Sequence, residues 1–372
     1  MKKVKVMSIF GTRPEAIKMA PIIQAMQKND QFEPITVVTG QHRQMLDQVL
    51  DIFKIKPDFD LNIMKQGQTL TTITNAVLTG MAQVFTKVKP DLVLVHGDTS
   101  TTFAAALSAF YHEIPIGHVE AGLRTWDKYS PYPEEMNRQM TDDLTDLYFA
   151  PTQLSKANLL KQNHPAQNIF ITGNTAIDAL NETVQADYQN DLLASLDSNK
   201  RMILVTMHRR ENQGLPMQQV FQAIRQVVDE RDDVQVVFPV HLNPKVQKMA
   251  EKELGHDELI KLVKPLDVID FHNLAAHSYF IMTDSGGVQE EAPALNKPVL
   301  VLRNTTERPE GVTAGTLKLV GTNPAKVKAA MIELLDNQNI YQTMAQAQNP
   351  YGDGHASDYI LDSILAWWNK QK

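Results

Sequence analysis

Residues 4–18 read Val4-Lys5-Val6-Met7-Ser8-Ile9-Phe10 and then Gly11-Thr12-Arg13-Pro14-Glu15-Ala16-Ile17-Lys18. The first half is an apolar run typical of a buried strand, and the second half opens a helical pattern with a proline where a helix would start. Unpaired N–H groups and the helix dipole favour an anion at such a turn, and Arg13 and Lys18 add positive charge. The stretch predicts an α/β fold with a phosphate site, and an ordinary strand-to-helix turn is the alternative when it is taken alone.

The same alternation of short β-branched runs with longer helical patterns continues along the whole chain. In the first half we expect strands at residues 4–10, 35–39, 92–96, 116–120, 147–150 and 169–172. In the second half we expect them at residues 202–207, 234–240, 260–263, 279–283, 299–302 and 317–320. Because these runs are apolar almost throughout, they indicate parallel sheets covered by helices on both faces.

The length of 372 residues exceeds what a single hydrophobic core usually holds, so two domains are expected. Residues 173–201 are polar and helix-prone, which puts the boundary near residue 172. We therefore expect domains at 1–172 and 173–355, with an amphipathic C-terminal helix at 356–370 that returns to the first domain. Ligands of open α/β sheets bind beyond the carboxyl ends of the strands, so we expect a cleft where the two sets of loops face each other.

The composition narrows the choice of partners. A net charge of −7 gives no long-range attraction to nucleic acid or to an anionic membrane, so small anions fit better. The chain has no cysteine, which excludes disulfides, thiolate metal sites and a cysteine nucleophile. The sequence shows neither a signal peptide nor an apolar run of the roughly 18 residues that a membrane span needs, so we expect a cytoplasmic protein.

Three acids in the first half follow strands or begin helices. Asp98 follows a buried strand, and capping of the next helix is the alternative to a functional role. Glu120 ends an apolar strand, where burial of its charge would be costly, and an ion pair with Arg124 is the alternative. Glu134 begins a helix four residues before Arg138, where an ordinary surface pair is the alternative.

The second half carries histidines and a glycine-rich turn at its strand ends. His208 and His241 stand near arginines and lack the spacing of a metal site, so they indicate an anionic ligand and no metal. The alternative is that both are ordinary core or surface histidines. Ser285-Gly286-Gly287 joins a strand to a helix and exposes N–H groups to a phosphate, unless it is a plain turn. Glu291, about one turn later, is placed for ribose hydroxyls.

Other nucleotide and metal signatures do not apply. The chain has no G-x-G-x-x-G after a strand for a nicotinamide cofactor and no G-x-x-x-x-G-K-[ST] for an NTPase. Asp58-Phe59-Asp60 matches the short DxD of some metal-dependent glycosyltransferases, but with Pro57 and its lysine-rich flank we interpret it as a loop. No cofactor is expected.

From Gly11 to Gly354 the chain resembles the bacterial non-hydrolysing UDP-N-acetylglucosamine 2-epimerases. The resemblance is carried, in order, by FGTRPEAIK, HGDTSTT, HVEAGLRT, YPEEMNR, ITGNTAIDAL, HRREN, PVHLNP, TDSGGVQEEAP and TTERPEGV. It implies a fold like that of the GT-B glycosyltransferases, with two Rossmann-like domains and UDP in the cleft between them. It also implies a homodimer and the interconversion of UDP-GlcNAc and UDP-ManNAc at C2.

The resemblance further implies roles for single residues. It places the diphosphate on Arg13, His208, Ser285, Gly286 and Gly287, the ribose on Glu291 and the uracil at Phe271. His208 also counts among the catalytic residues with the acid/base carboxylates Asp98, Glu120 and Glu134, while Lys18, Arg138 and Arg308 supply charge or orient the sugar. A second UDP-GlcNAc, acting as an activator, would bind Gln41, His42, Gln44, Arg209 and His241. Some relatives carry arginine where this chain has Gly67, which is a departure near that second site.

Three other functions share parts of this pattern. A GT-B glycosyltransferase has the same fold and donor but needs an acceptor, and a hydrolysing epimerase releases free ManNAc and UDP. A non-catalytic sugar-nucleotide sensor needs the phosphate and uracil contacts but no base, so the three carboxylates speak against it.

Overall fold

The computed structural model describes residues 2–255 and 257–371, which divide into two compact units. Unit 1 comprises Met1–Ala179 and Tyr351–Lys372, and unit 2 comprises Leu180–Pro350. The division falls inside helix α7 (Thr175–Thr183), a few residues beyond the boundary near residue 172 that the sequence suggests. The described helices include none with an apolar stretch long enough to cross a membrane.

Unit 1 is built on a seven-stranded parallel sheet in the order β3-β2-β1-β4-β5-β6-β7. Its strands are β1 (Val4–Phe10), β2 (Phe32–Val38), β3 (Phe59–Asp60), β4 (Leu92–His96), β5 (Ile116–Val119), β6 (Leu147–Ala150) and β7 (Ile169–Ile171). Its helices are α1 (Arg13–Gln27), α2 (Arg43–Ile52), α3 (Leu70–Val88), α4 (Ser100–Tyr111), α5 (Glu134–Leu144), α6 (Gln153–Lys161), the first part of α7 and α16 (Ala356–Lys370), with a short 3-10 helix at Ala166–Asn168. The interpretation of Asp58-Phe59-Asp60 as a loop is wrong, because Phe59 and Asp60 pair with Val37 and Val38 as the edge strand.

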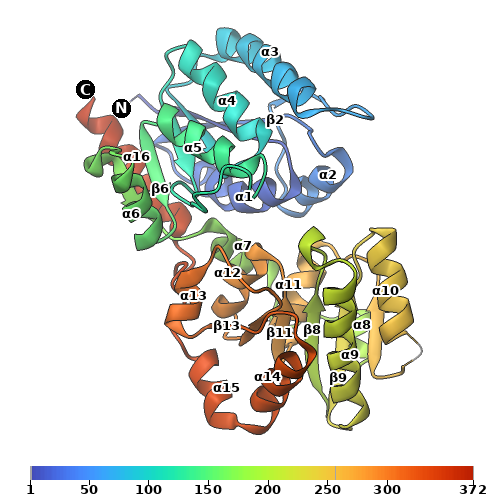
Figure 1. Ribbon diagram of the computed structural model, residues 1–372. Coiled ribbons are helices and arrows are strands. Elements are labelled where there is room, and N and C mark those ends of the chain that lie inside the picture. The colour runs from blue at the N-terminus through green and yellow to red at the C-terminus, as the bar shows by residue number, and fades with distance from the viewer. Residues whose placement is uncertain (1, 256, 372) are drawn as a thin grey trace. The chain divides into compact units, whose positions relative to one another are not determined.

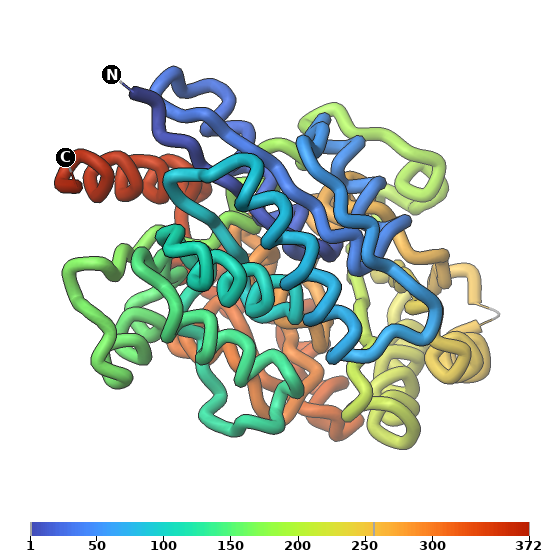
Figure 2. Tube along the Cα trace, turned by 90° about the horizontal axis from the view of Figure 1, so that it is seen from above, coloured from blue at the N-terminus to red at the C-terminus, as the bar shows by residue number. Residues whose placement is uncertain are grey.

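Helices cover both faces of this sheet, as its apolar strands predict (Figure 1). On one face Met7, Ile9 and Val95 pack with Met81 and Phe85 of α3. Helix α1 lies on the opposite face, where α16 packs beside it. Figure 2 shows α16 in red next to the N-terminal segment, and Lys2 Nζ lies 5.7 Å from the centre of the Trp368 ring.

Unit 2 is built on a six-stranded parallel sheet in the order β10-β9-β8-β11-β12-β13. Its strands are β8 (Arg201–Thr206), β9 (Val234–Pro239), β10 (Ile260–Val263), β11 (Phe280–Thr283), β12 (Val299–Val301) and β13 (Leu317–Leu319). Its helices are the end of α7, α8 (Asp191–Ala194), α9 (Leu215–Asp229), α10 (Pro244–Leu254), α11 (Val268–His277), α12 (Gly286–Ala294), α13 (Pro309–Ala314), α14 (Pro324–Asp336) and α15 (Gln338–Ala345), with a 3-10 helix at Arg210–Asn212. Side chains of β8 alternate between two cores: Ile203 and Val205 pack with α9, and Met202 and Leu204 pack with α11 and α12.

Both sheets therefore have the strand order of a Rossmann fold, and the parallel α/β class expected from the sequence is confirmed. The order reverses direction between β1 and β4 in unit 1 and between β8 and β11 in unit 2. In open α/β sheets the loops that leave the carboxyl ends of two such strands diverge to opposite sides of the sheet, and ligands typically bind at that point.

Candidate active site

In unit 1 the turn after β1 is packed so closely that only glycine fits at position 11. A Cβ atom on Gly11 would lie against Thr39 Oγ1 and 2.7 Å from Thr101 Oγ1. Thr101 in turn donates to Gln41 Oε1 at 2.9 Å, and Gln41 is buried. The start of α1 is thus fixed against the ends of β2 and α4, which holds the predicted anion-binding turn in place.

Glu15 joins the first turns of two helices. Its Oε2 accepts the N–H groups of Gly11 and Thr12 at 3.1 and 2.8 Å, and its Oε1 accepts the hydroxyls of Thr99 and Thr102 at 2.8 and 3.0 Å. Burial raises the pKa of this carboxyl group, and the hydrogen bonds oppose that shift. No role for Glu15 is predicted from the sequence, although its position three residues after Thr12 is the spacing of a capping box.

Glu120 follows β5 with a backbone φ of +66°, a left-handed conformation that costs a non-glycine residue about 1–2 kcal/mol. Its Oε2 forms an ion pair with Lys18 Nζ, accepts Asn174 Nδ2 at 2.7 Å and lies 3.7 Å from His96 Nε2. Burial is the main reason why the pKa of His96 is lowered to about 3, so this imidazole is neutral near pH 7. The structure thus places a largely buried carboxylate beside a lysine at the carboxyl end of a central strand.

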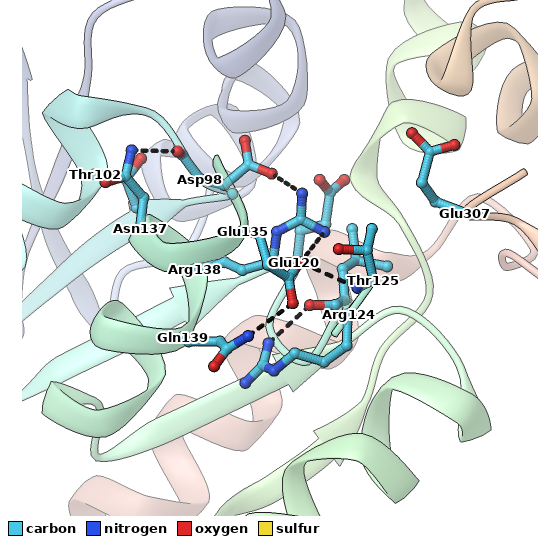
Figure 3. Close-up of polar contacts among 12 residues, drawn as sticks. Asp98, Thr102, Glu120, Arg124, Thr125, Glu135, Asn137, Arg138, Gln139 and Glu307 are labelled. Atoms are coloured by element: carbon cyan, nitrogen blue, oxygen red, sulfur yellow. Dashed lines mark hydrogen bonds and ion pairs between the residues drawn. The ribbon is translucent and has the colours of Figure 1, made fainter. Parts of the chain in front are cut away.

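Asp98 lies after β4 and pairs with Arg138 of α5 at 2.7 Å (Figure 3). The cap of α4 is Thr99, whose side chain accepts the Thr102 N–H, so the alternative role of Asp98 as a helix cap does not hold. Arg138 also lies 3.7 Å from Glu135, a fully buried carboxylate that the sequence analysis did not single out.

Glu134 is the first residue of α5 and is half-buried. The carboxylates that contact Arg138 are those of Asp98 and Glu135, so the surface pair of Glu134 with Arg138, weighed as an alternative, is not what the described residues form.

Arg124 does not supply the counter-charge of Glu120 that the sequence offered as an alternative. Its Nη2 lies 2.6 Å from Oδ2 of the fully buried Asp142, whose other oxygen lies 2.6 Å from His118 Nδ1. His118 Nε2 lies 2.7 Å from the carbonyl oxygen of Gly97. His118 thus connects the turn before Asp98 to Asp142, which is itself paired with Arg124.

In unit 2 a buried acid shapes the loop after β8. Asp284, at the end of β11, is fully buried and accepts the N–H of His208 at 3.0 Å, the N–H of Arg209 at 2.9 Å and Asn212 Nδ2 at 2.9 Å. The ring of His208 stacks on that of His241, with centroids 5.4 Å apart and planes within 9°. The pKa of His208 is lowered, chiefly by burial, so this ring is mostly neutral at pH 7.

The first turn of α12 is flanked by two guanidinium groups. A Cβ atom on Gly286 would lie 3.3 Å from Arg308 Cζ and 3.6 Å from Arg209 Nη2. Arg308 is oriented by Glu290, which accepts its Nε–H at 2.8 Å. A helix N-terminus without side chains and with two arginines beside it fits a phosphate group.

Comparison with known proteins agrees with this geometry. Residues 24–365 match the family model described as UDP-N-acetylglucosamine 2-epimerase. The Bacillus subtilis UDP-N-acetylglucosamine 2-epimerase is 59% identical over 372 residues, which cover all of this chain and 98% of that protein. The chain belongs to the UDP-N-acetylglucosamine 2-epimerase family.

Two solved structures of high similarity contain nucleotide ligands. The S. aureus protein MnaA, solved together with UDP, is 53% identical with a TM-score of 0.92, over 99% of this chain and 97% of that one. The Neisseria meningitidis UDP-GlcNAc 2-epimerase bound to UDP-GlcNAc is 46% identical with a TM-score of 0.92, over 98% of this chain and all of that one.

In this member of the epimerase family the residues singled out from the sequence lie near strand ends or in the helices that follow. Unit 1 holds Arg13, Lys18, Gln41, His42, Gln44, Asp98, Glu120, Glu134 and Arg138. Unit 2 holds His208, Arg209, His241, Phe271, Ser285, Gly286, Gly287, Glu291 and Arg308. Within the units the structure brings together Lys18 with Glu120, Asp98 with Arg138, and Arg308 with Gly286.

The residues proposed for a second nucleotide differ in accessibility. Gln41 is buried, whereas His42 and Gln44 are exposed at the start of α2. In unit 2 Arg209 is half-buried and His241 is exposed. Phe271 is half-buried and packs on the core of unit 2, and Glu291 lies 3.7 Å from His272.

Proposed function

We propose that the protein interconverts UDP-GlcNAc and UDP-ManNAc by inverting C2, without net hydrolysis. The observation that carries the proposal is the carboxylate of Glu120, whose side chain is 9% exposed and which is paired with Lys18 at the carboxyl end of β5, in a chain of the 2-epimerase family. A carboxylate held beside a lysine can serve as a base that accepts a proton.

The chemistry explains why the site needs both acids and an anion cradle. C2 of the sugar is not next to a carbonyl, so loss of its proton alone would leave an unstabilised carbanion. If the C1–O bond breaks as the proton leaves C2, the C–H electron pair forms the C1=C2 bond and UDP departs with the C–O pair. The product is 2-acetamidoglucal, and return of UDP to C1 with a proton added to the other face of C2 gives the epimer.

We assign the roles accordingly. Asp98, Glu120 and Glu134 are the acid/base groups around C2, with Lys18 and Arg138 as their cations. The departing diphosphate is received by Arg13, His208, Ser285, Gly286, Gly287 and Arg308. Uracil stacks at Phe271 and the ribose hydroxyls bind Glu291. The pairs of Arg308 with Glu290 and of Arg138 with Asp98 support these assignments because each orients a charged group within its unit.

Incubation of the protein with UDP-GlcNAc alone in D2O, followed by proton NMR, tests the proposal. We expect UDP-ManNAc to appear with deuterium at C2. Accumulation of free ManNAc and UDP would instead identify a hydrolysing epimerase, and turnover only after addition of an acceptor would identify a glycosyltransferase.

Two variants separate catalysis from binding. Asp98→Asn and Glu120→Gln keep the shape of the side chains but remove their ability to take a proton, so each is expected to abolish turnover while UDP still binds. Unchanged rates in both variants would refute the assignment, and a wild-type protein that binds UDP-GlcNAc without converting it would be a sensor.

We also propose that a second UDP-GlcNAc activates the enzyme through Gln41, His42, Gln44, Arg209 and His241. The initial rate from UDP-ManNAc alone should rise when UDP-GlcNAc is added, and a constant rate would contradict this. A homodimer and a cytoplasmic location stay predictions, of which the first is checked by sedimentation equilibrium.

A further inference from the structure

Asn174 lies just before α7 and is almost fully buried, with 3% of its surface exposed. Its Nδ2 is 2.7 Å from Glu120 Oε2, and its Oδ1 accepts the N–H of Ala176 at 2.9 Å. Its own N–H donates to the carbonyl oxygen of Tyr351 at 2.7 Å. Tyr351 is the first residue of unit 1 after the chain returns from unit 2.

These contacts fix the direction of the amide group. Because the Ala176 N–H needs an acceptor, the oxygen of Asn174 points to α7 and the NH2 group points to Glu120. An amide NH2 group can only donate, so this hydrogen bond favours the ionised form of the Glu120 carboxyl group over the protonated form.

The backbone around Asn174 is also held closely. A Cβ atom on Gly173 would lie 3.1 Å from the Cα atom of Gly352, so the outgoing and returning segments of the chain touch backbone to backbone. Asn174 therefore presents its NH2 group from a fixed point, unlike a lysine on a flexible stem.

We propose that Asn174 is a positioning residue that holds Glu120 ionised and fixes its Oε2 for proton transfer. The proposal rests on the proposed function, in which Glu120 exchanges a proton with C2.

The other groups that face Glu120 act differently. Lys18, from α1, supplies the formal charge on the same oxygen. His96, from β4, is neutral and too distant for a hydrogen bond at 3.7 Å. His118, from β5, uses its two ring nitrogens for Asp142 and the Gly97 carbonyl. Asn174 is thus the neutral, rigid donor of this set.

The test is the pH dependence of kcat/KM in Asn174 variants. Asn174→Asp keeps the acceptor for Ala176 but replaces the donor with a second carboxylate. The acidic limb of the profile should then move up by at least about one pH unit, because like charges raise the pKa of one partner. Asn174→Ser keeps a hydroxyl acceptor near Ala176 but shortens the side chain, so the hydrogen bond to Glu120 is lost. The acidic limb of its kcat/KM profile should move up by about half to one pH unit, and kcat should fall about tenfold.

Thr175→Val is the matched control. Thr175 is the next residue, is 1% exposed, and its hydroxyl has no hydrogen-bond partner within residues 2–255 and 257–371. Its replacement alters the same turn without touching Glu120, so the acidic limb should stay at the wild-type pH. UDP affinity, measured by calorimetry, should stay at the wild-type value in all three variants.

Reduced rates in both Asn174 variants with an unmoved acidic limb would overturn the proposal and leave Asn174 a structural residue. A titration that needs no turnover separates this failure from failure of the proposed function. In protein labelled with 13C at glutamate carboxyl carbons, the signal lost in Glu120→Gln should titrate at a higher pH in Asn174→Asp than in wild type. Equal titration would refute the role of Asn174 even in a protein that proved to be no epimerase.

Discussion

Replacing Asp284 with asparagine should disturb the loop after β8, which we propose binds the diphosphate. The carboxylate is fully buried and accepts three donors, the N–H groups of His208 and Arg209 and Asn212 Nδ2, each at 2.9–3.0 Å from Oδ2. The uncharged amide oxygen can replace Oδ2, but each bond falls from the 1.5–3 kcal/mol of a charged acceptor to about 0.5–1.5 kcal/mol. The summed loss is about 3 kcal/mol, reduced somewhat because no charge is buried any longer.

Two measurements check this magnitude. For a unit of this size, a loss of 2–3 kcal/mol lowers the melting temperature by about 5–10 °C, which calorimetry resolves. Titration with UDP should show affinity weaker by about tenfold or more, because a weaker, uncharged acceptor then holds the N–H groups of His208 and Arg209. The two effects should appear together, since both follow from the same three hydrogen bonds.

Asp336→Asn is the control, because it makes the same chemical change in the same unit at an exposed side chain paired with Arg231. Its free energy of unfolding should change by less than about 0.5 kcal/mol and its UDP affinity should be that of the wild type. If Asp284→Asn melts and binds UDP as the wild type does, Asp284 does not organise the loop.

Three further substitutions test other parts of the site. Burial raises the pKa of Glu15, so the folded protein holds this proton more tightly than the unfolded chain does, and stability falls as the pH rises above the unfolded value of 4.5. Glu15→Gln should remove that decline when the free energy of unfolding in urea is measured at a series of pH values above 4.5. Equal slopes in the variant and the wild type would contradict this. Gly286→Ala places a methyl group 3.3 Å from Arg308 Cζ. It should weaken UDP binding about tenfold without lowering the melting temperature. An unchanged UDP affinity, measured by calorimetry, would show that no anion binds at this turn. His118→Phe removes the hydrogen bond to the Gly97 carbonyl and leaves Asp142 with Arg124 as its charged partner. The free energy of unfolding, measured in urea, should therefore fall by about 2–4 kcal/mol. A fall of less than about 1 kcal/mol would refute the buried pair of His118 and Asp142.

Much of the fold could be predicted because its strands are buried on both faces. The apolar runs mark twelve of the thirteen strands in the part of the chain that the structure describes, with ends that differ by a few residues at most. The strand that the sequence does not predict, Phe59–Asp60, is two residues long and lies at a sheet edge. So short a strand gives no periodic signal, and its pairing with β2 depends on the rest of the sheet.

Candidate site residues could be proposed from the sequence, but their partners could not. The sequence suggests ion pairs of Glu120 with Arg124 and of Glu134 with Arg138, since these residues are near each other in the chain. The structure pairs Glu120 with Lys18 and Arg138 with Asp98, across 102 and 40 residues of chain. Such pairs form because parallel strands bring their carboxyl ends to one edge, which is a property of strand order rather than of local spacing.

The pairing also bears on how inversion at C2 proceeds. Glu120 and Asp98 each contact a cation of their own, Lys18 and Arg138 respectively, so the two acids do not share a proton with each other. Inversion needs a proton removed from one face and another delivered to the opposite face, so the delivering group must first be protonated by exchange with solvent. We therefore expect UDP-ManNAc formed in D2O to carry deuterium at C2 from the first turnover. Product that retained the original hydrogen would mean that a single group carries the proton between the faces, which two separately paired carboxylates do not allow.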